Sequence, residues 1–98
     1  MLKLFLRPVA KSEIQGATEW YDSKATDLGD AFLFEIEHTF SFIREHPLSF
    51  PRTRFQSRKA KLRRFPYCIY YYILKDRIVV SACLHNSRNV DKILEKRV

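Results

Sequence analysis

The amino-acid sequence predicts an α+β fold: an N-terminal strand, an antiparallel two-helix hairpin and then a three-stranded antiparallel meander, with the helices packed on one face of the sheet. Apolar residues recur at every second position before Pro8, at helical spacing up to His46, and at every second position again from about Ser57. Two-residue links join the later segments, which is typical of hairpins. With 98 residues, 46% of them hydrophobic, the chain is expected to form a single domain over residues 1–98.

The first two elements follow from the change of period at Pro8. Leucines alternate with other residues over positions 2–6, which predicts a short strand that Pro8 ends. Small and apolar residues then recur at helical spacing from Ala10, and Pro8 itself suits a helix entry, so a first helix is expected to run to about Lys24. Ser12 and Gln15 have the spacing of a capping box near its start.

A second helix is expected to start after Asp27, which can cap it, and to end at His46, because the following Pro47 disfavours helical backbone. One side of this helix forms a wide apolar stripe made of Leu28, Phe32, Ile36, Thr39, Phe40 and Ile43. The short link at residues 25–27 predicts that the two helices form an antiparallel hairpin.

Three strands are expected over Ser57–Arg64, Tyr67–Leu74 and Arg77–His85, which are rich in aromatic and β-branched residues or alternate in polarity. If both links are tight, each pairing is fixed. The last two strands then place Tyr67 opposite Leu84 and Ile69 opposite Ala82, all on the buried face.

The same pairing predicts a basic and aromatic opposite face, listed here by cross-strand neighbours: Lys59 beside Tyr72, Lys61 beside Tyr70, and Arg63 beside Cys68 and Cys83. Cations interleaved with tyrosine rings suit single-stranded nucleic acid or an acidic amphipathic helix. The two cysteines are expected to be free thiols. Residues 89–98 have helical spacing but could equally form an extended arm.

Charge is concentrated in the second half of the chain. Residues 1–50 carry a net charge of −3 and residues 51–98 a net charge of +10. Seven Lys or Arg residues lie between positions 52 and 64, with no carboxylate among them. Such a segment is expected to attract a polyanion, although cations also protect a sheet edge from aggregation.

Several function classes are not expected. The sequence has no run of apolar residues long enough to cross a membrane and no signal-peptide pattern, so a cytoplasmic protein is expected. His38, His46 and His85 fall on different elements, and the two glycines stand alone. We therefore expect no metal site and no nucleotide cofactor.

An ordered set of residues resembles the ParE branch of the RelE/ParE toxin superfamily over nearly the whole chain. Its most specific parts are the run Arg63-Arg64-Phe65-Pro66-Tyr67, followed by Ile69 and Tyr71, and then Ile78, Val80, Ala82, His85 and Arg88. The resemblance implies a toxin of a type II toxin–antitoxin system, associated with plasmid stabilisation and growth arrest. It also implies a cognate antitoxin as partner and DNA gyrase as the enzyme that the toxin inhibits by binding.

The residues expected to contact a partner are Lys59, Lys61, Arg63, Tyr70, Tyr72, Arg77, Arg88 and Arg97. No catalytic residue is expected in this interpretation. The alternative is a RelE-like endonuclease that cleaves mRNA on the ribosome, with Lys59, Lys61, Arg63, His85 and Arg88 as its catalytic residues. An inactive, toxin-like interaction module is the third interpretation.

Overall fold

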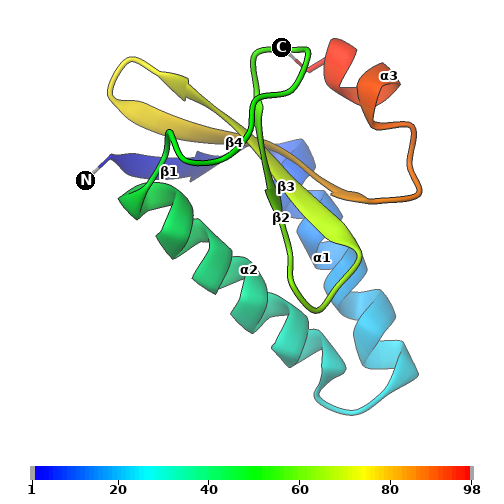
Figure 1. Cartoon of the computed structure of the whole chain (residues 1–98). Helices are drawn as coiled ribbons and strands as arrows, with labels where there is room; N and C mark the ends of the chain where they lie inside the picture. The colour runs from blue at the N-terminus through cyan, green and yellow to red at the C-terminus, as the bar shows by residue number, and fades with distance from the viewer. Residues whose placement is uncertain (1, 98) are drawn as a thin grey trace.

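A computed structural model describes residues 2–97. Its elements are β1 (Lys3–Leu6), α1 (Pro8–Lys24), α2 (Leu28–Glu45), β2 (Arg58–Lys61), β3 (Tyr67–Leu74), β4 (Arg77–His85) and α3 (Val90–Glu95) (Figure 1). The strands form one sheet in the order β1-β4-β3-β2, in which β1 runs parallel to β4 and the other pairs are antiparallel. The predicted α+β fold is confirmed, and the parallel pairing of β1 makes the sheet mixed.

The first helix begins at the proline that was expected to suit a helix entry. Helix α1 starts at Pro8, whose fixed φ suits the first helical turn, and Arg7 precedes it in an extended conformation. Ser12 therefore lies inside the helix, and the predicted capping box with Gln15 is wrong. Helix α2 has the expected bounds, with Asp27 at its N-cap, but Asp27 makes no side-chain capping bond.

Asp22 of α1 takes over the capping role. Its Oδ1 accepts a hydrogen bond from the backbone N–H of Gly29, at 2.9 Å, across the turn between the helices. A Cβ atom on Gly29 would overlap the Asp22 carboxylate, so only glycine permits this close approach. The contact ties the two helices together at their connection.

The register of β3 and β4 differs from the prediction because of a bulge. The pairs Tyr71↔Val80 and Ile73↔Ile78 are as expected, but the register shifts between Tyr70 and Tyr71. Ser81 is the extra residue, so beyond it the pairs are Tyr70↔Ala82, Ile69↔Cys83, Cys68↔Leu84 and Tyr67↔His85. The expected neighbours Tyr67 and Leu84, Ile69 and Ala82, and Cys68 and Cys83 are therefore wrong.

Strand β2 is shorter than expected and pairs two residues away from the predicted position. Lys59 lies opposite Tyr70 and Lys61 opposite Cys68, in place of Tyr72 and Tyr70. The strand ends at Lys61, because residues 62–66 form a wide turn that the Leu62 N–H closes by donating to the Tyr67 carbonyl. Arg63 consequently pairs with neither cysteine.

The bulge divides the sheet residues between two cores. The core under the hairpin contains Ala60, Ile69, Tyr71, Ile78, Val80 and Cys83, packed on apolar residues of α1 and α2. The second core lies on the opposite face and contains Cys68, Tyr70, Ala82, Leu84 and Leu94. Helix α3 supplies Leu94, so the C-terminal segment forms a helix that covers the second face. Both cysteines are free and buried.

An ion pair holds the end of the chain against the bulge. The Glu13 carboxylate of α1 accepts hydrogen bonds from the two terminal nitrogens of the Arg97 guanidinium, at 2.9 and 3.0 Å. It also accepts from the backbone N–H of Cys83 at 3.0 Å. Arg97 also donates to the Ser81 carbonyl at 3.2 Å, and Arg7 donates to the Arg97 carbonyl at 3.2 Å. The Glu13 and Arg97 side chains are each 18% exposed. We call this arrangement the C-terminal clasp.

None of the helices in residues 2–97 has the length and apolar character that a membrane span requires.

We predict opposite effects for alanine at the two glycines. Gly29→Ala is expected to lower the free energy of unfolding by about 1–2 kcal/mol, because the new methyl group displaces Asp22 and breaks its bond to the backbone. Gly16→Ala is the matched control, since its Cβ would meet nothing within 4 Å in the middle of α1. This control is expected to raise the same free energy by about 0.5–1 kcal/mol. Urea denaturation measures both, and equal effects would contradict the proposed role of Asp22.

Glu13→Gln is predicted to loosen the C-terminal clasp. The loss of a mostly buried ion pair is expected to lower the free energy of unfolding by about 1–3 kcal/mol and to speed proteolysis of the C-terminal segment. Glu95→Gln, on an exposed position of α3, is the control and is expected to change stability by less than about 0.5 kcal/mol. Unchanged proteolysis of the Glu13→Gln variant would argue against the clasp.

Candidate docking surfaces

Three cations of the second half gather beside the edge of the sheet. Lys61, Arg63 and Arg64, together called the cationic turn, are exposed where β2 leads into residues 62–66. Glu35 of α2 fixes this backbone, because its carboxylate accepts from the N–H groups of both Arg63 and Arg64. The carboxylate thus binds the backbone of the turn and leaves the charged ends of the side chains at the surface.

Next to the cationic turn, α2 carries a row of exposed rings that we call the aromatic ridge. It consists of Phe34, His38 and Phe42 on one side of α2 and of His46, the residue directly after the helix, with a spacing of four residues between neighbours. Neighbouring ring centroids lie 6.3, 5.3 and 6.5 Å apart. Phe34 is 74% exposed and Phe42 is 49% exposed. Exposed large apolar side chains that gather in one place mark interaction sites.

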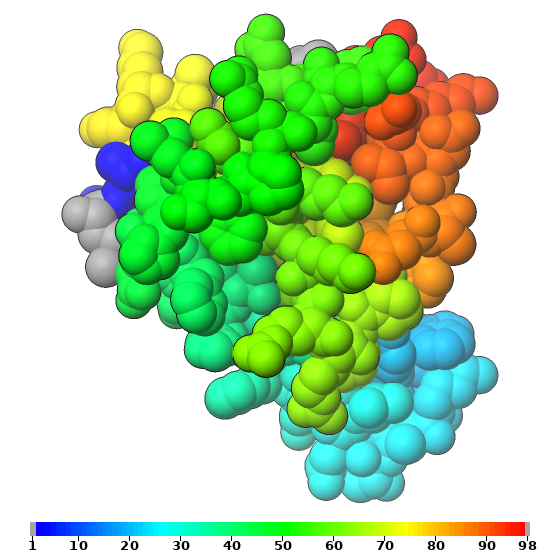
Figure 2. Space-filling model, in the orientation of Figure 1, coloured from blue at the N-terminus to red at the C-terminus, as the bar shows by residue number. Residues whose placement is uncertain are grey.

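A groove separates the aromatic ridge from the cationic turn. It consists of two hollows, of about 270 and 250 Å³, which share Glu35, His38 and Arg63. Phe34 lines one end, and Phe42 and Phe50 line the other. Figure 2 shows residues 58–66 alongside α2 on the visible face. We call this hollow the docking groove.

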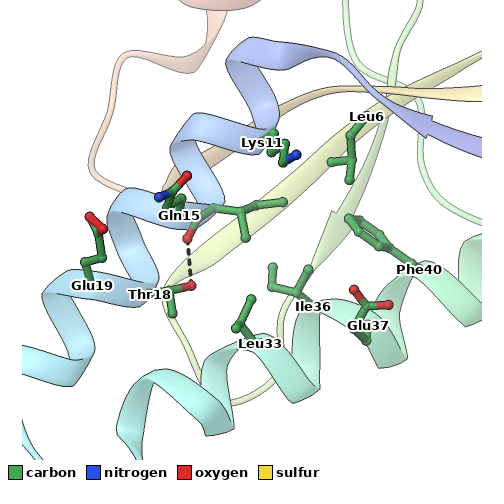
Figure 3. Close-up of a pocket in the computed structure, with 10 residues that line it drawn as sticks. Leu6, Lys11, Gln15, Thr18, Glu19, Leu33, Ile36, Glu37 and Phe40 are labelled. Atoms are coloured by element: carbon green, nitrogen blue, oxygen red, sulfur yellow. Dashed lines mark hydrogen bonds between the residues drawn. The ribbon is translucent and has the colours of Figure 1, made fainter.

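A second groove lies between α1 and α2, near β1 (Figure 3). Its volume is about 420 Å³. The apolar lining consists of Leu6, Ile14, Leu33, Ile36 and Phe40, and the polar lining of Lys11, Gln15, Thr18, Glu19 and Glu37. Thr18 donates its hydroxyl proton to the Ile14 carbonyl at 2.7 Å. One cation, Lys11, and two carboxylates line this groove. In the docking groove the cations Lys61, Arg63 and Arg64 instead outnumber its one carboxylate, Glu35.

The predicted basic and aromatic face is partly covered by the chain itself. Lys59 and Lys61 are exposed, but Tyr70 is 2% exposed because α3 and Phe55 pack over it. Burial is the main cause that raises the pKa of the Tyr70 hydroxyl. Tyr70 therefore offers no ring to a partner while α3 is in place, whereas Tyr72 is partly exposed.

The other predicted contact residues do not gather at one place. Arg77 lies at the β3–β4 turn, with its guanidinium 5.4 Å from the centre of the Phe5 ring. Arg97 is engaged in the C-terminal clasp. Arg88 follows β4 at the opposite end of the sheet from Arg77, and it is exposed. Of the eight predicted residues, only Lys61 and Arg63 line the docking groove.

The residues of the nuclease interpretation fall on two faces. Lys59 and Lys61 pair with Tyr70 and Cys68, whose side chains belong to the second core. The bulge places His85 opposite Tyr67 on the hairpin side, with the two rings 5.1 Å apart. In the described part of the chain, no group of three or more His, Cys, Asp or Glu residues could hold a metal ion.

Sequence reasoning missed the aromatic ridge. Phe34 and Phe42 lie outside the apolar stripe that was assigned to the core, and their own four-residue spacing was the signal that could have identified a second apolar side of α2. Glu35 was also missed as the residue that positions the cationic turn.

No protein-family model matches this sequence, and no curated protein sequence is significantly similar to it. A chain of the solved structure described as "Chromosomal ParDE TA system from P. aeruginosa" is similar in fold, with a TM-score of 0.64 and 12% sequence identity. The match covers 87% of this chain and 96% of that chain. The protein therefore has the fold of a component of that ParDE system.

Proposed function

We propose that this protein is the toxin of a type II toxin–antitoxin pair, similar to ParE, and that it acts by binding its target. The observation that carries the proposal is the docking groove, where exposed Phe34 and Phe42 face the cationic turn on a fold similar to that of a ParDE component. Such a surface suits a macromolecular partner.

The chemistry of the docking groove favours an acidic amphipathic helix as the partner. Its apolar side would cover the aromatic ridge, and its carboxylates would meet Lys61, Arg63 and Arg64. We assign this role to the C-terminal part of a cognate antitoxin, because antitoxins of the resembling family neutralise their toxins with such a segment.

The proposed target is DNA gyrase, which the toxin would hold on DNA without catalytic turnover of its own. The exposed cations Lys59, Lys61 and Arg63 would contact the target, and the antitoxin would mask part of the same surface. Competition for this surface would explain how one partner neutralises the effect of the other.

A RelE-like endonuclease is less well supported. Cleavage at one phosphate needs a base, an acid and charge-stabilising groups within reach of the same atoms. Lys59 and Lys61 belong to one face of the sheet, and His85 lies on the other. We therefore rank this interpretation below the gyrase inhibitor.

The function is tested by expressing the chain alone in bacteria and by adding the purified protein to gyrase. Growth arrest with DNA breaks, intact messages and inhibited supercoiling is the expected result. Messages cut at codons on ribosomes would instead support the nuclease interpretation, and harmless expression would favour the inactive module.

The double variant Phe34→Ser and Phe42→Ser is predicted to bind the antitoxin encoded beside this chain about 30-fold more weakly or worse, because truncated central aromatic contacts are costly. Phe5→Ser is the matched control, since Phe5 is similarly exposed but lies on β1, outside the docking groove. Titration calorimetry measures both affinities.

Two results of this titration would contradict the assignment. Equal losses in the double variant and the control would mean that the docking groove has no special part in binding. Binding that survives the double variant but is lost in Leu33→Ser would place the antitoxin in the groove between α1 and α2.

A further inference from the structure

An aromatic pocket lies apart from the docking groove, where the C-terminal half of α1 meets the start of β3 and the end of β4. It is an open hollow of about 330 Å³, lined by Trp20, Tyr21, Pro66, Tyr67 and His85. It shares none of these residues with the docking groove or with the groove between α1 and α2. We call it the aromatic pocket.

The rings of the aromatic pocket form a connected series. The centroids of Trp20 and Tyr21 lie 5.1 Å apart, those of Tyr21 and Tyr67 lie 6.2 Å apart, and those of Tyr67 and His85 lie 5.1 Å apart. Tyr21 also packs on Phe65, at 4.9 Å, in the hairpin core. Tyr21 and Tyr67, the two middle rings of the series, are thus held by the hairpin core.

Trp20 is not needed to fill the core, because 55% of its surface is exposed. It lies at the rim of the pocket, with more than half of its surface open to solvent and the Lys24 ammonium over its ring. A planar ligand could stack on this surface while its edge enters the hollow.

Positive charge borders the pocket. The Lys24 ammonium lies 5.0 Å from the centre of the Trp20 ring. Arg88 follows His85 closely, and its backbone N–H donates to the His85 carbonyl at 3.0 Å, which holds this second cation beside the pocket. The Nδ1 atom of His85 accepts a hydrogen bond from the Ser87 N–H at 3.0 Å, which leaves the proton of the neutral ring on Nε2 as a donor.

We propose that the aromatic pocket binds an unpaired nucleobase together with its phosphate group. The base would stack on Trp20 among the tyrosine rings, and Lys24 or Arg88 would bind the phosphate. Lys24 and Arg88 would repel a cationic ligand, and a purely apolar ligand would make no favourable contact with their charges. A base within a duplex is stacked and paired, so it cannot enter.

This proposal does not rest on the toxin function or on the docking groove. A base with its phosphate could come from a free nucleotide or from a single strand of nucleic acid, and the first experiment distinguishes these two ligands. Trp20 is the only tryptophan in the chain, so its fluorescence reports directly on stacking in the pocket.

The first experiment titrates the full chain with AMP, a short single-stranded DNA, a single-stranded RNA and a DNA duplex. Quenching of Trp20 by the single strands, with much weaker quenching by the duplex, is the expected result. If AMP binds as tightly as the strands, the ligand is a free nucleotide; if the strands bind at least tenfold more tightly, it is a single strand. No quenching by AMP or by either strand at millimolar concentration would overturn the proposal.

The second experiment measures the anisotropy of a labelled single strand with variants. Trp20→Ala is expected to weaken binding about tenfold, whereas Trp20→Phe, which keeps a ring, is expected to lose less. Arg88→Gln is expected to weaken binding and to reduce its dependence on salt. The Arg88 variant also tests the site should Trp20→Ala fail to fold, which circular dichroism would reveal.

Matched controls separate the pocket from general attraction to the basic surface. Phe5→Ala removes an exposed ring of β1, far from any proposed site, and it should leave the affinity unchanged. Lys61→Gln removes a cation from the cationic turn and should have less effect than Arg88→Gln. Affinity that falls with Lys61→Gln but not with Trp20→Ala or Arg88→Gln would overturn the proposal.

Discussion

The extra residue in β4 determines which side chains each face of the sheet presents. Beyond Ser81, every residue of β4 lies on the face opposite to the one that regular pairing would give it. Glu13 satisfies the backbone at this point, since it accepts from the Cys83 N–H and binds the arginine that in turn donates to the Ser81 carbonyl. A carboxylate of α1 and a cation near the C-terminus therefore hold the irregular part of the sheet.

The aromatic pocket, the surface under α3 and the cationic turn lie at three separate places on the molecule. His85 joins Tyr67 and Trp20 at the end of the hairpin side, while Ala82 and Leu84 form an apolar seat for α3 on the other side. The cationic turn remains at the sheet edge beside α2. A ligand bound in the aromatic pocket would therefore leave the docking groove open.

The sequence predicted the elements well because their signals are local, and it failed where distant segments decide the outcome. The helix over residues 28–45 follows from its own apolar period and from Pro47. By contrast, the regular alternation of Ile78, Val80, Ala82 and Leu84 gives no sign of a bulge, which depends on contacts with Glu13 and α3. The concentration of Lys and Arg near the site could be predicted from the sequence. Their arrangement could not, because it depends on Glu35 of α2, which binds the backbone of the cationic turn.

The C-terminal clasp connects both ends of the described chain, since Arg7 before α1 donates to the carbonyl of Arg97 after α3. Loss of the Arg97 side chain would break its bonds to Glu13 and Ser81 and free the helix that covers Tyr70. Tyr70 and Cys68 would then become an exposed apolar strip beside Lys59. The contacts of Arg97 thus help to keep the second core out of solvent.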